Sequence, residues 1–153
     1  MHSPDLAVID DQRLKLISIG WLDPEHSFEK GAVDESFFAR LMSLLVNPWQ
    51  PFAAAGRHPC SFCRFSGGPG TVRYRPPRGG EMQVDVGAAN VFVPGDGVLY
   101  MAPSSIAHYI DAHQYRPPDE FIAAVLACPD MRSIDYLRAI HAVGGMALTK
   151  PPV

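Results

Sequence analysis

The sequence predicts an α+β fold, with a small antiparallel sheet and about four helices. Residues 35–46 carry apolar side chains at the helical period, and the last third of the chain shows the same period between proline and glycine breaks. Residues 72–101 instead contain short apolar runs separated by Pro- and Gly-rich turn sequences, which is typical of hairpins. Together these patterns predict the α+β class.

The first third of the chain contains one predicted strand and one predicted helix. Residues 14–22 begin with apolar alternation, which predicts a strand with one buried face that Asp23-Pro24 ends. Asp34 suits the N-cap of a helix over residues 35–46, which Asn47-Pro48 ends. The apolar stripe of this helix consists of Phe37, Phe38, Leu41, Leu44 and Leu45.

The remaining elements are four short strands followed by three helices. The strand runs are residues 72–75, 82–86, 91–93 and 98–101. One helix is predicted from near Pro103 to His113, a second follows Pro117-Pro118, and a third begins after Ser133 and stops at Gly144-Gly145. We expect residues 1–153 to form a single domain, with 1–12 and 146–153 as loose termini.

Composition limits the classes of function. The 153 residues are 47% hydrophobic and 19% charged, with a net charge of −3, which gives no general attraction to nucleic acid or anionic lipid. A local arginine group is interpreted as a solvated strand and loop: Arg64, Arg73, Arg75 and Arg78. Three cysteines are too few for a disulfide framework, and neither a signal peptide nor an apolar span is visible, so we expect a reduced, cytoplasmic, soluble protein.

Two distant segments together offer a set of metal ligands. Cys60-x-x-Cys63 lets two thiolates reach one ion from a tight turn, and His108 and His113 have a spacing within the range of paired zinc histidines. Two thiolates balance the charge of Zn²⁺, so burying the complete site costs little. The sequence therefore predicts a structural Cys₂His₂ zinc site that joins the cysteine turn to the late helix.

Some details of the ligand set stay open. Five residues along a regular helix rotate a side chain by about 140°, so His108 and His113 share a face only if the last turn distorts, which the nearby Pro117-Pro118 favours. His58 is an alternative ligand in place of either histidine. Cys128 is expected to be a buried small apolar residue. Three further histidines are interpreted as surface or core residues: His2, His26 and His141.

A structural zinc site predicts a protein-binding or accessory role, through a surface that the sequence does not locate. The alternative is a zinc-dependent hydrolase with an open coordination position, in which His58, Cys60 and Cys63 bind the ion and Asp111 or Glu120 acts as base. A third possibility is that the thiols are core residues and no metal binds. The sequence favours a non-enzymatic role, because the His-Glu-x-x-His, deaminase and nucleotide-loop motifs are absent. It leaves the oligomeric state open.

Five segments of the chain form a recognisable pattern: Gly20-Trp21-Leu22-Asp23, Gly56-x-His58-x-Cys60-x-x-Cys63, Tyr100-x-Ala102-Pro103, His108-Tyr109-Ile110-x-x-His113-x-Tyr115-x-Pro117-Pro118 and Phe121-Ile122-x-Ala124-Val125. Together they resemble a family of small bacterial proteins with a domain of unknown function. The resemblance covers about residues 15–127, and its most specific part is the run from His108 to Pro118. It implies a bacterial, cytoplasmic setting and no mechanism, and it unites the cysteine and histidine segments in one pattern.

Overall fold

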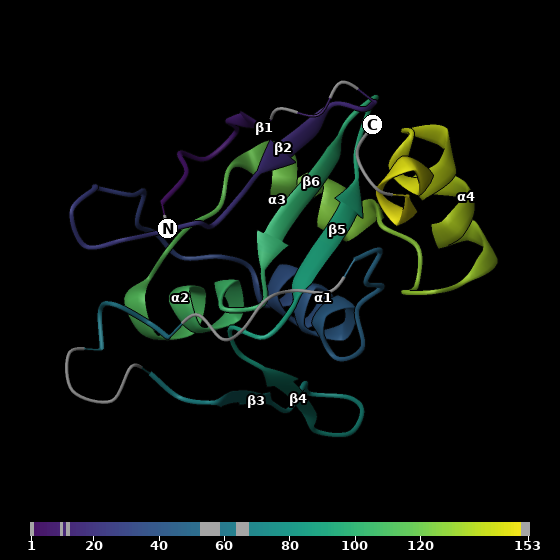
Figure 1. The fold of residues 1–153 in the computed structure, drawn as a ribbon. Helices are drawn as coiled ribbons and strands as arrows, with labels where there is room; N and C mark the ends of the chain where they lie inside the picture. Colours follow the sequence, from purple (N-terminus) through teal and green to yellow (C-terminus); the bar gives the residue numbers. More distant parts are fainter. Residues whose placement is uncertain (1, 10, 12, 53–58, 64–67, 151–153) are drawn as a thin grey trace.

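The computed structural model describes residues 2–9, 11, 13–52, 59–63 and 68–150, and it has the predicted α+β class with four α-helices in these residues (Figure 1). Two sheets and one short 3₁₀ helix complete the architecture. In chain order the elements are β1 (Val8–Ile9), β2 (Leu16–Ser18), α1 (Glu35–Leu45), β3 (Thr71–Tyr74), β4 (Met82–Asp85), β5 (Asn90–Pro94), β6 (Leu99–Pro103), α2 (Ile106–His113), α3 (Asp119–Ala127), α4 (Ile134–Ala142) and η1 (Gly145–Thr149).

The main sheet has four strands in the order β1-β2-β6-β5, and β3 and β4 form a separate two-stranded sheet. β2 and β6 run parallel, with Leu16 opposite Leu99, whereas the other pairs are antiparallel. The prediction of one antiparallel sheet was therefore wrong in two respects: the runs are divided between two sheets, and the larger sheet is mixed. A parallel pair joins segments that are distant in sequence, so no turn signal reveals it.

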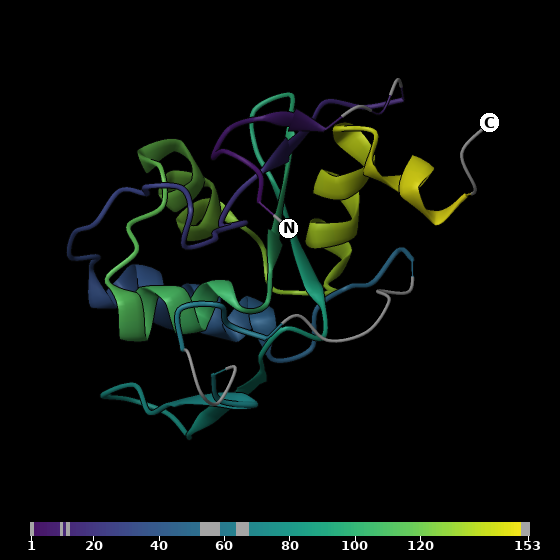
Figure 2. The same ribbon diagram turned by 60° about the vertical axis from the view of Figure 1, so that its left-hand side comes forward.

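Helices cover both faces of the main sheet (Figure 2). On one face, the ring of Tyr100 in β6 packs edge-on against Phe121 of α3, with centroids 5.8 Å apart. On the other face, the Tyr136 hydroxyl of α4 donates a hydrogen bond of 2.6 Å to the backbone carbonyl of Phe92 in β5. Because this carbonyl lies on the outer edge of the sheet, α4 protects an edge that could otherwise pair with another strand.

The helices largely follow the predicted boundaries. α1 begins directly after Asp34, as expected, and the Ser133 hydroxyl accepts a hydrogen bond from the N–H of Tyr136 at the start of α4. α2 begins at Ile106, later than predicted, because Pro103 still pairs with Asn90 in the sheet. None of the described helices has the length and apolar character that crossing a bilayer requires.

The described part of residues 1–12 lies against the fold. Its strand β1 pairs with β2, and the Asp5 carboxylate accepts hydrogen bonds from the N–H of Gly20 at 2.9 Å and from the Tyr115 hydroxyl at 2.7 Å. Tyr115 directly follows the C-cap of α2 and is fully buried. This contact therefore fixes the chain just beyond the helix that carries His108 and His113.

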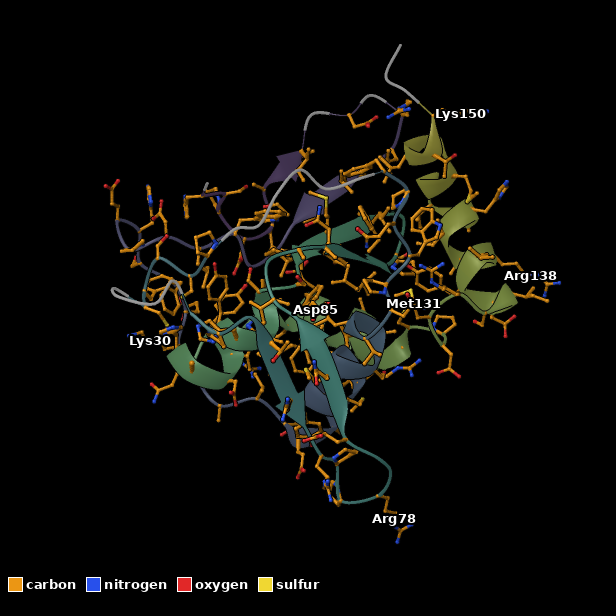
Figure 3. All side chains as sticks on the ribbon, turned by 60° about the horizontal axis from the view of Figure 1, so that its bottom comes forward. Lys30, Arg78, Asp85, Met131, Arg138 and Lys150 are labelled. Carbon is orange, nitrogen blue, oxygen red and sulfur yellow. The ribbon has the colours of Figure 1, made fainter. Side chains whose placement is uncertain are left out.

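The β3–β4 hairpin lies apart from the main sheet, at the bottom of Figure 1, and carries exposed arginines. Arg73, Arg75 and Arg78 are all exposed, and Figure 3 shows Arg78 at the outer end of the hairpin, pointing away from the body of the protein. Glu81 and Asp85 lie on the same hairpin, so its charge is mixed. Arg64, the fourth arginine of the group, lies outside the described residues.

Candidate metal centre

The two cysteines lie at the ends of one tight turn. The N–H of Cys63 donates to the carbonyl of Cys60 at 3.3 Å, and the backbone N–H groups of Phe62 and Cys63 also donate to the Cys60 sulfur. Such a turn places both side chains on the same side of the backbone. Cys60 is 3% exposed and Cys63 is half-buried, so the pair points into the protein rather than into solvent.

The two histidines converge because the last turn of α2 is wider than an α-helical turn. The N–H of Gln114 donates to the carbonyl of Tyr109, five residues back, and Gln114 has a left-handed backbone with φ of 59°. A turn with this i→i−5 bond rotates each residue through a smaller angle, so five residues come closer to a full circle. The distortion that brings His108 and His113 onto one face is thus present, and it lies in the last turn of α2, which ends at His113.

The donor atoms of the four side chains meet at the separations of a tetrahedral zinc site. Zn–S bonds of about 2.3 Å and Zn–N bonds of about 2.0–2.1 Å place sulfur and nitrogen about 3.5 Å apart, and two nitrogens about 3.3 Å apart. The Nε2 of His113 lies 3.5 Å from the Cys60 sulfur and 3.6 Å from the Cys63 sulfur. The Nε2 of His108 lies 3.4 Å from the Cys63 sulfur and 3.3 Å from the Nε2 of His113.

Hydrogen bonding alone is a weaker explanation of this arrangement. A thiol–imidazole hydrogen bond needs only one pair of atoms, whereas all four donor atoms here lie within 4.8 Å of one another. The two imidazole rings are perpendicular and direct their Nε2 atoms toward each other. Four ligand atoms around a common centre are what a cation requires, so the residues present fit a four-coordinate metal ion.

Burial shifts the pKa of both histidines and of Cys60. Burial lowers the pKa of His108 and of His113, which keeps both imidazoles in the neutral form that binds metal. Burial raises the pKa of the Cys60 thiol, and the amide hydrogen bonds to its sulfur oppose that rise only in part. A cation would supply the missing stabilisation of the thiolates, because a metal-bound thiol loses its proton.

Aromatic side chains cover the centre. Phe62, between the two cysteines, packs against the His113 ring with centroids 5.2 Å apart and against Tyr109 at 6.0 Å. Phe28 packs on the other side of Phe62 at 5.5 Å and on Tyr115 at 6.0 Å. These aromatic contacts lie beside His113 and the cysteine turn, and only the spatial arrangement reveals them.

Gly68 closes another side of the centre. Its backbone φ is +85°, and a Cβ atom there would lie 2.8 Å from the Cβ of Cys60 and 3.4 Å from the Nε2 of His108. Only glycine can therefore bring the backbone this close to both ligands. The sequence marks Gly68 as part of a glycine-rich stretch, but it does not indicate this contact.

A second group of potential ligands consists of His2, Asp23 and His26, of which the two histidines were interpreted as surface or core residues. His26 lies 2.7 Å from the Asp23 carboxylate through its Nδ1, and its ring is stacked on His2 with centroids 3.8 Å apart and planes 3° apart. The lone pair of an imidazole nitrogen lies in the ring plane, so one ion cannot lie in the planes of two stacked rings. This arrangement therefore does not form a metal site as it stands.

Of the other predicted residues, Asp111 and Glu120 are exposed on α2 and α3, and two more lie outside the described residues or elsewhere in the fold. His58, the alternative ligand, belongs to the segment that the structure does not describe. Cys128 is buried at the end of α3, as expected, with its backbone carbonyl accepting from Arg40. Burial raises the pKa of the Cys128 thiol to about 11.

The three thiols should therefore differ in reactivity toward iodoacetamide. A thiol with a pKa of about 11 is thiolate in only about one molecule in a thousand at pH 8, so Cys128 should stay unmodified in the native protein. Cys60 and Cys63 should be protected in metal-loaded protein and become modified after a chelator is added. Peptide mass spectrometry measures each site, and equal modification of Cys60 with and without chelator would contradict the metal centre.

Comparison with known proteins places the chain in a family. A family model described as "Domain of unknown function (DUF7919)" matches residues 1–126, which include both cysteines of the turn and both histidines of α2. No curated protein and no solved structure matches the chain significantly.

Proposed function

We propose that this chain, which belongs to the family DUF7919, binds one Zn²⁺ ion through Cys60, Cys63, His108 and His113, and that the ion has a structural role. The observation that carries this proposal is the set of four donor atoms at tetrahedral separations. Zinc is the favoured ion, because two sulfurs and two imidazole nitrogens in this geometry suit it better than the oxygen-preferring cations.

Burial and charge support a structural role. Cys60 and His108 are 3% and 4% exposed, and Phe62 covers His113. Two thiolates cancel the charge of the ion, so the complete centre is neutral and stable in a buried position. The hydrolase alternative needs an open position for water, and four protein donors leave none in a tetrahedral site. The proposal includes a reducing, cytoplasmic setting, in which the two thiols remain available as ligands.

The structural ion would hold two distant parts of the chain together. The cysteine turn has no regular structure of its own, and the ion would tie it to the last turn of α2, about 50 residues later in the sequence. A surface built from both segments would then have a fixed shape. This arrangement supports a protein-binding or accessory role, in which the metal maintains a recognition surface and performs no chemistry.

Metal analysis of protein purified without a histidine tag tests the proposal. We expect about one zinc per chain by mass spectrometry, and a tetrahedral thiolate spectrum after exchange for cobalt. Cys60→Ser and His113→Ala should each lose the ion. Two matched controls should retain it: Cys128→Ala changes a buried cysteine elsewhere, and His26→Ala changes a histidine of the stacked pair.

Three results would contradict the proposal. Protein with far less than one metal per chain after incubation with zinc would remove the centre itself. Equal metal loss in Cys60→Ser and Cys128→Ala would show that metal binding does not depend specifically on the four proposed ligands. A five-coordinate cobalt spectrum with an exchangeable water would favour the hydrolase alternative.

A further inference from the structure

The four candidate ligands are divided by their chemistry as well as by their position. Both sulfurs lie on the cysteine turn, and both imidazoles lie on α2. Peroxides oxidise a thiolate, and an oxidised sulfur no longer holds the metal, because the thiolate is the form of cysteine that binds it. Oxidation of the two cysteines would therefore remove half of the ligand set, and with it every ligand that the turn contributes.

The turn is compact enough for its two sulfurs to bond to each other. The hydrogen bond from the N–H of Cys63 to the carbonyl of Cys60 closes a four-residue turn. The Cα atoms at the ends of such a turn lie within about 7 Å of each other, and a disulfide usually needs them about 4.4–6.8 Å apart. The two sulfurs already lie within 4.8 Å of each other. Formation of a disulfide therefore requires mainly rotation of the two side chains.

Exposure and hydrogen bonding distinguish the two sulfurs. Cys60 is buried, whereas Cys63 is half-buried and is therefore more accessible to a small oxidant. The Cys60 sulfur also accepts hydrogen bonds from the N–H groups of Phe62 and Cys63, which withdraw electron density from it. We therefore expect the oxidant to react first at Cys63, and Cys60 is placed to complete the disulfide.

We propose that the cysteine turn is a reversible oxidation site, at which hydrogen peroxide joins Cys60 to Cys63 and the zinc ion is released. The proposal rests on the proposed function and gives that function a means of regulation. The Cys63 sulfur attacks one peroxide oxygen, the O–O bond breaks, and a sulfenic acid and a hydroxide form. The Cys60 sulfur then attacks the Cys63 sulfur, the S–S bond forms, and a second hydroxide leaves. Two protons convert the hydroxides to water, so two electrons pass from the sulfurs to the peroxide.

Formation of the disulfide should separate the cysteine turn from α2. Disulfide sulfurs carry no charge, so Zn²⁺ would lose two ligands together with the charges that balance its own. His108 and His113 would remain as two neutral ligands, which is half of the set that a structural zinc site requires. A surface built from both segments would then lose its fixed shape. A dithiol reductant reverses the change, because it supplies two electrons to the S–S bond and restores both thiols.

Cys128 provides an internal control for this reaction. It is buried at the end of α3, and burial raises the pKa of its thiol to about 11. Since the thiolate is the reactive form, Cys128 should react with peroxide far more slowly than the cysteines of the turn. The disulfide should therefore form within one chain and should not involve Cys128.

Zinc release measured with a chromogenic chelator tests the proposal. Zinc-loaded protein, with its metal content measured beforehand, is treated with hydrogen peroxide and compared with protein from which a chelator has removed the ion. Peroxide should release about one zinc per chain for each equivalent consumed, and peptide mass spectrometry should find Cys60 joined to Cys63 with the loss of two hydrogen atoms. Oxidised protein should rebind zinc only after reduction with dithiothreitol, whereas chelated protein should rebind it directly. Cys128→Ala should respond as the unchanged chain does.

A trapping experiment tests the order of the two steps. Dimedone reacts with a sulfenic acid and so captures the first product before the disulfide forms. With a limiting amount of peroxide and an excess of dimedone, the adduct on zinc-loaded protein should lie mainly on Cys63. An adduct mainly on Cys60 would overturn the assignment of Cys63 as the sulfur that reacts first.

The outcomes separate this inference from the proposed function. Zinc-loaded protein that keeps its ion after peroxide treatment would overturn the oxidation site and leave the metal centre intact. Release of zinc without a bond between Cys60 and Cys63 would also overturn it, whether the product is a disulfide between two chains or oxidised methionine alone. Protein that holds no zinc before peroxide is added would overturn the metal centre and, with it, the release of the ion.

Discussion

Removal of the metal should lower the melting temperature by about 8–16 °C. An ion that binds only the folded state, at a free concentration about 1,000 times its dissociation constant, stabilises that state by about 4 kcal/mol. In a chain of 150–250 residues each kcal/mol corresponds to about 2–4 °C. Structural zinc sites in isolated zinc fingers have larger binding free energies, so 8–16 °C is about the smallest fall that we expect. Differential scanning calorimetry with and without chelator measures the change.

Cys60→Ala should lower the melting temperature by a similar amount, and chelator should then cause no further fall. Cys128→Ala is the matched control, since it deletes a buried thiol of the same size far from the centre and should stay sensitive to chelator. The comparison separates the loss of the ion from the loss of a packed side chain. An unchanged melting temperature in the presence of chelator, in protein shown to contain zinc beforehand, would contradict a structural role.

Local sequence signals located the four helices, with the start of α2 misplaced by a few residues. In the predicted stripe of α1, Phe37, Leu41, Leu44 and Leu45 are buried, whereas Phe38 is only half-buried. Ser133 could be assigned as a cap because a serine hydroxyl before an apolar stripe satisfies a free amide of the first turn. Such features depend on residues within one or two turns, which the sequence shows directly.

Pairing between distant strands could not be predicted. β2 and β6 pair in parallel although Leu16 and Leu99 are far apart in the chain, and no turn links them. Turn sequences did identify the β3–β4 and β5–β6 hairpins, because each pair is joined by a short loop rich in glycine. The sequence therefore indicated which strands are neighbours through a turn, but not that the two hairpins belong to different sheets.

The candidate centre was predictable for a chemical reason rather than a geometric one. Thiols and imidazoles at ligand spacings are uncommon enough to be recognised, so Cys60, Cys63, His108 and His113 could be grouped before their positions were known. The sequence showed that the two histidines could share a face only if the last turn of α2 was distorted, but it did not show the form of that distortion. The contacts of Phe62 and Gly68 depend on how the loops fold over the ligands, and no local pattern encodes that.

Gly68→Ala should destabilise the metal-loaded protein by about 2–5 kcal/mol. The left-handed backbone of Gly68, with φ of +85°, costs an alanine about 1–2 kcal/mol. Its new Cβ would also lie 2.8 Å from the Cβ of Cys60. Overpacking of this kind typically destabilises a protein by about 1–3 kcal/mol more. Because Cys60 would have to move, the variant should also bind zinc more weakly. Urea denaturation and a zinc competition assay measure the two effects.

Gly97→Ala provides the matched control for this substitution. Gly97 also has a left-handed backbone, with φ of +67°, but nothing lies within 4 Å of the position of its Cβ. It should therefore lose only the backbone contribution and keep its full zinc affinity. The difference between the two variants isolates the contact of Gly68 with the cysteine turn. That difference should shrink in chelated protein, where the turn can move away, and equal losses in both variants under all conditions would show that Gly68 does not press against the centre.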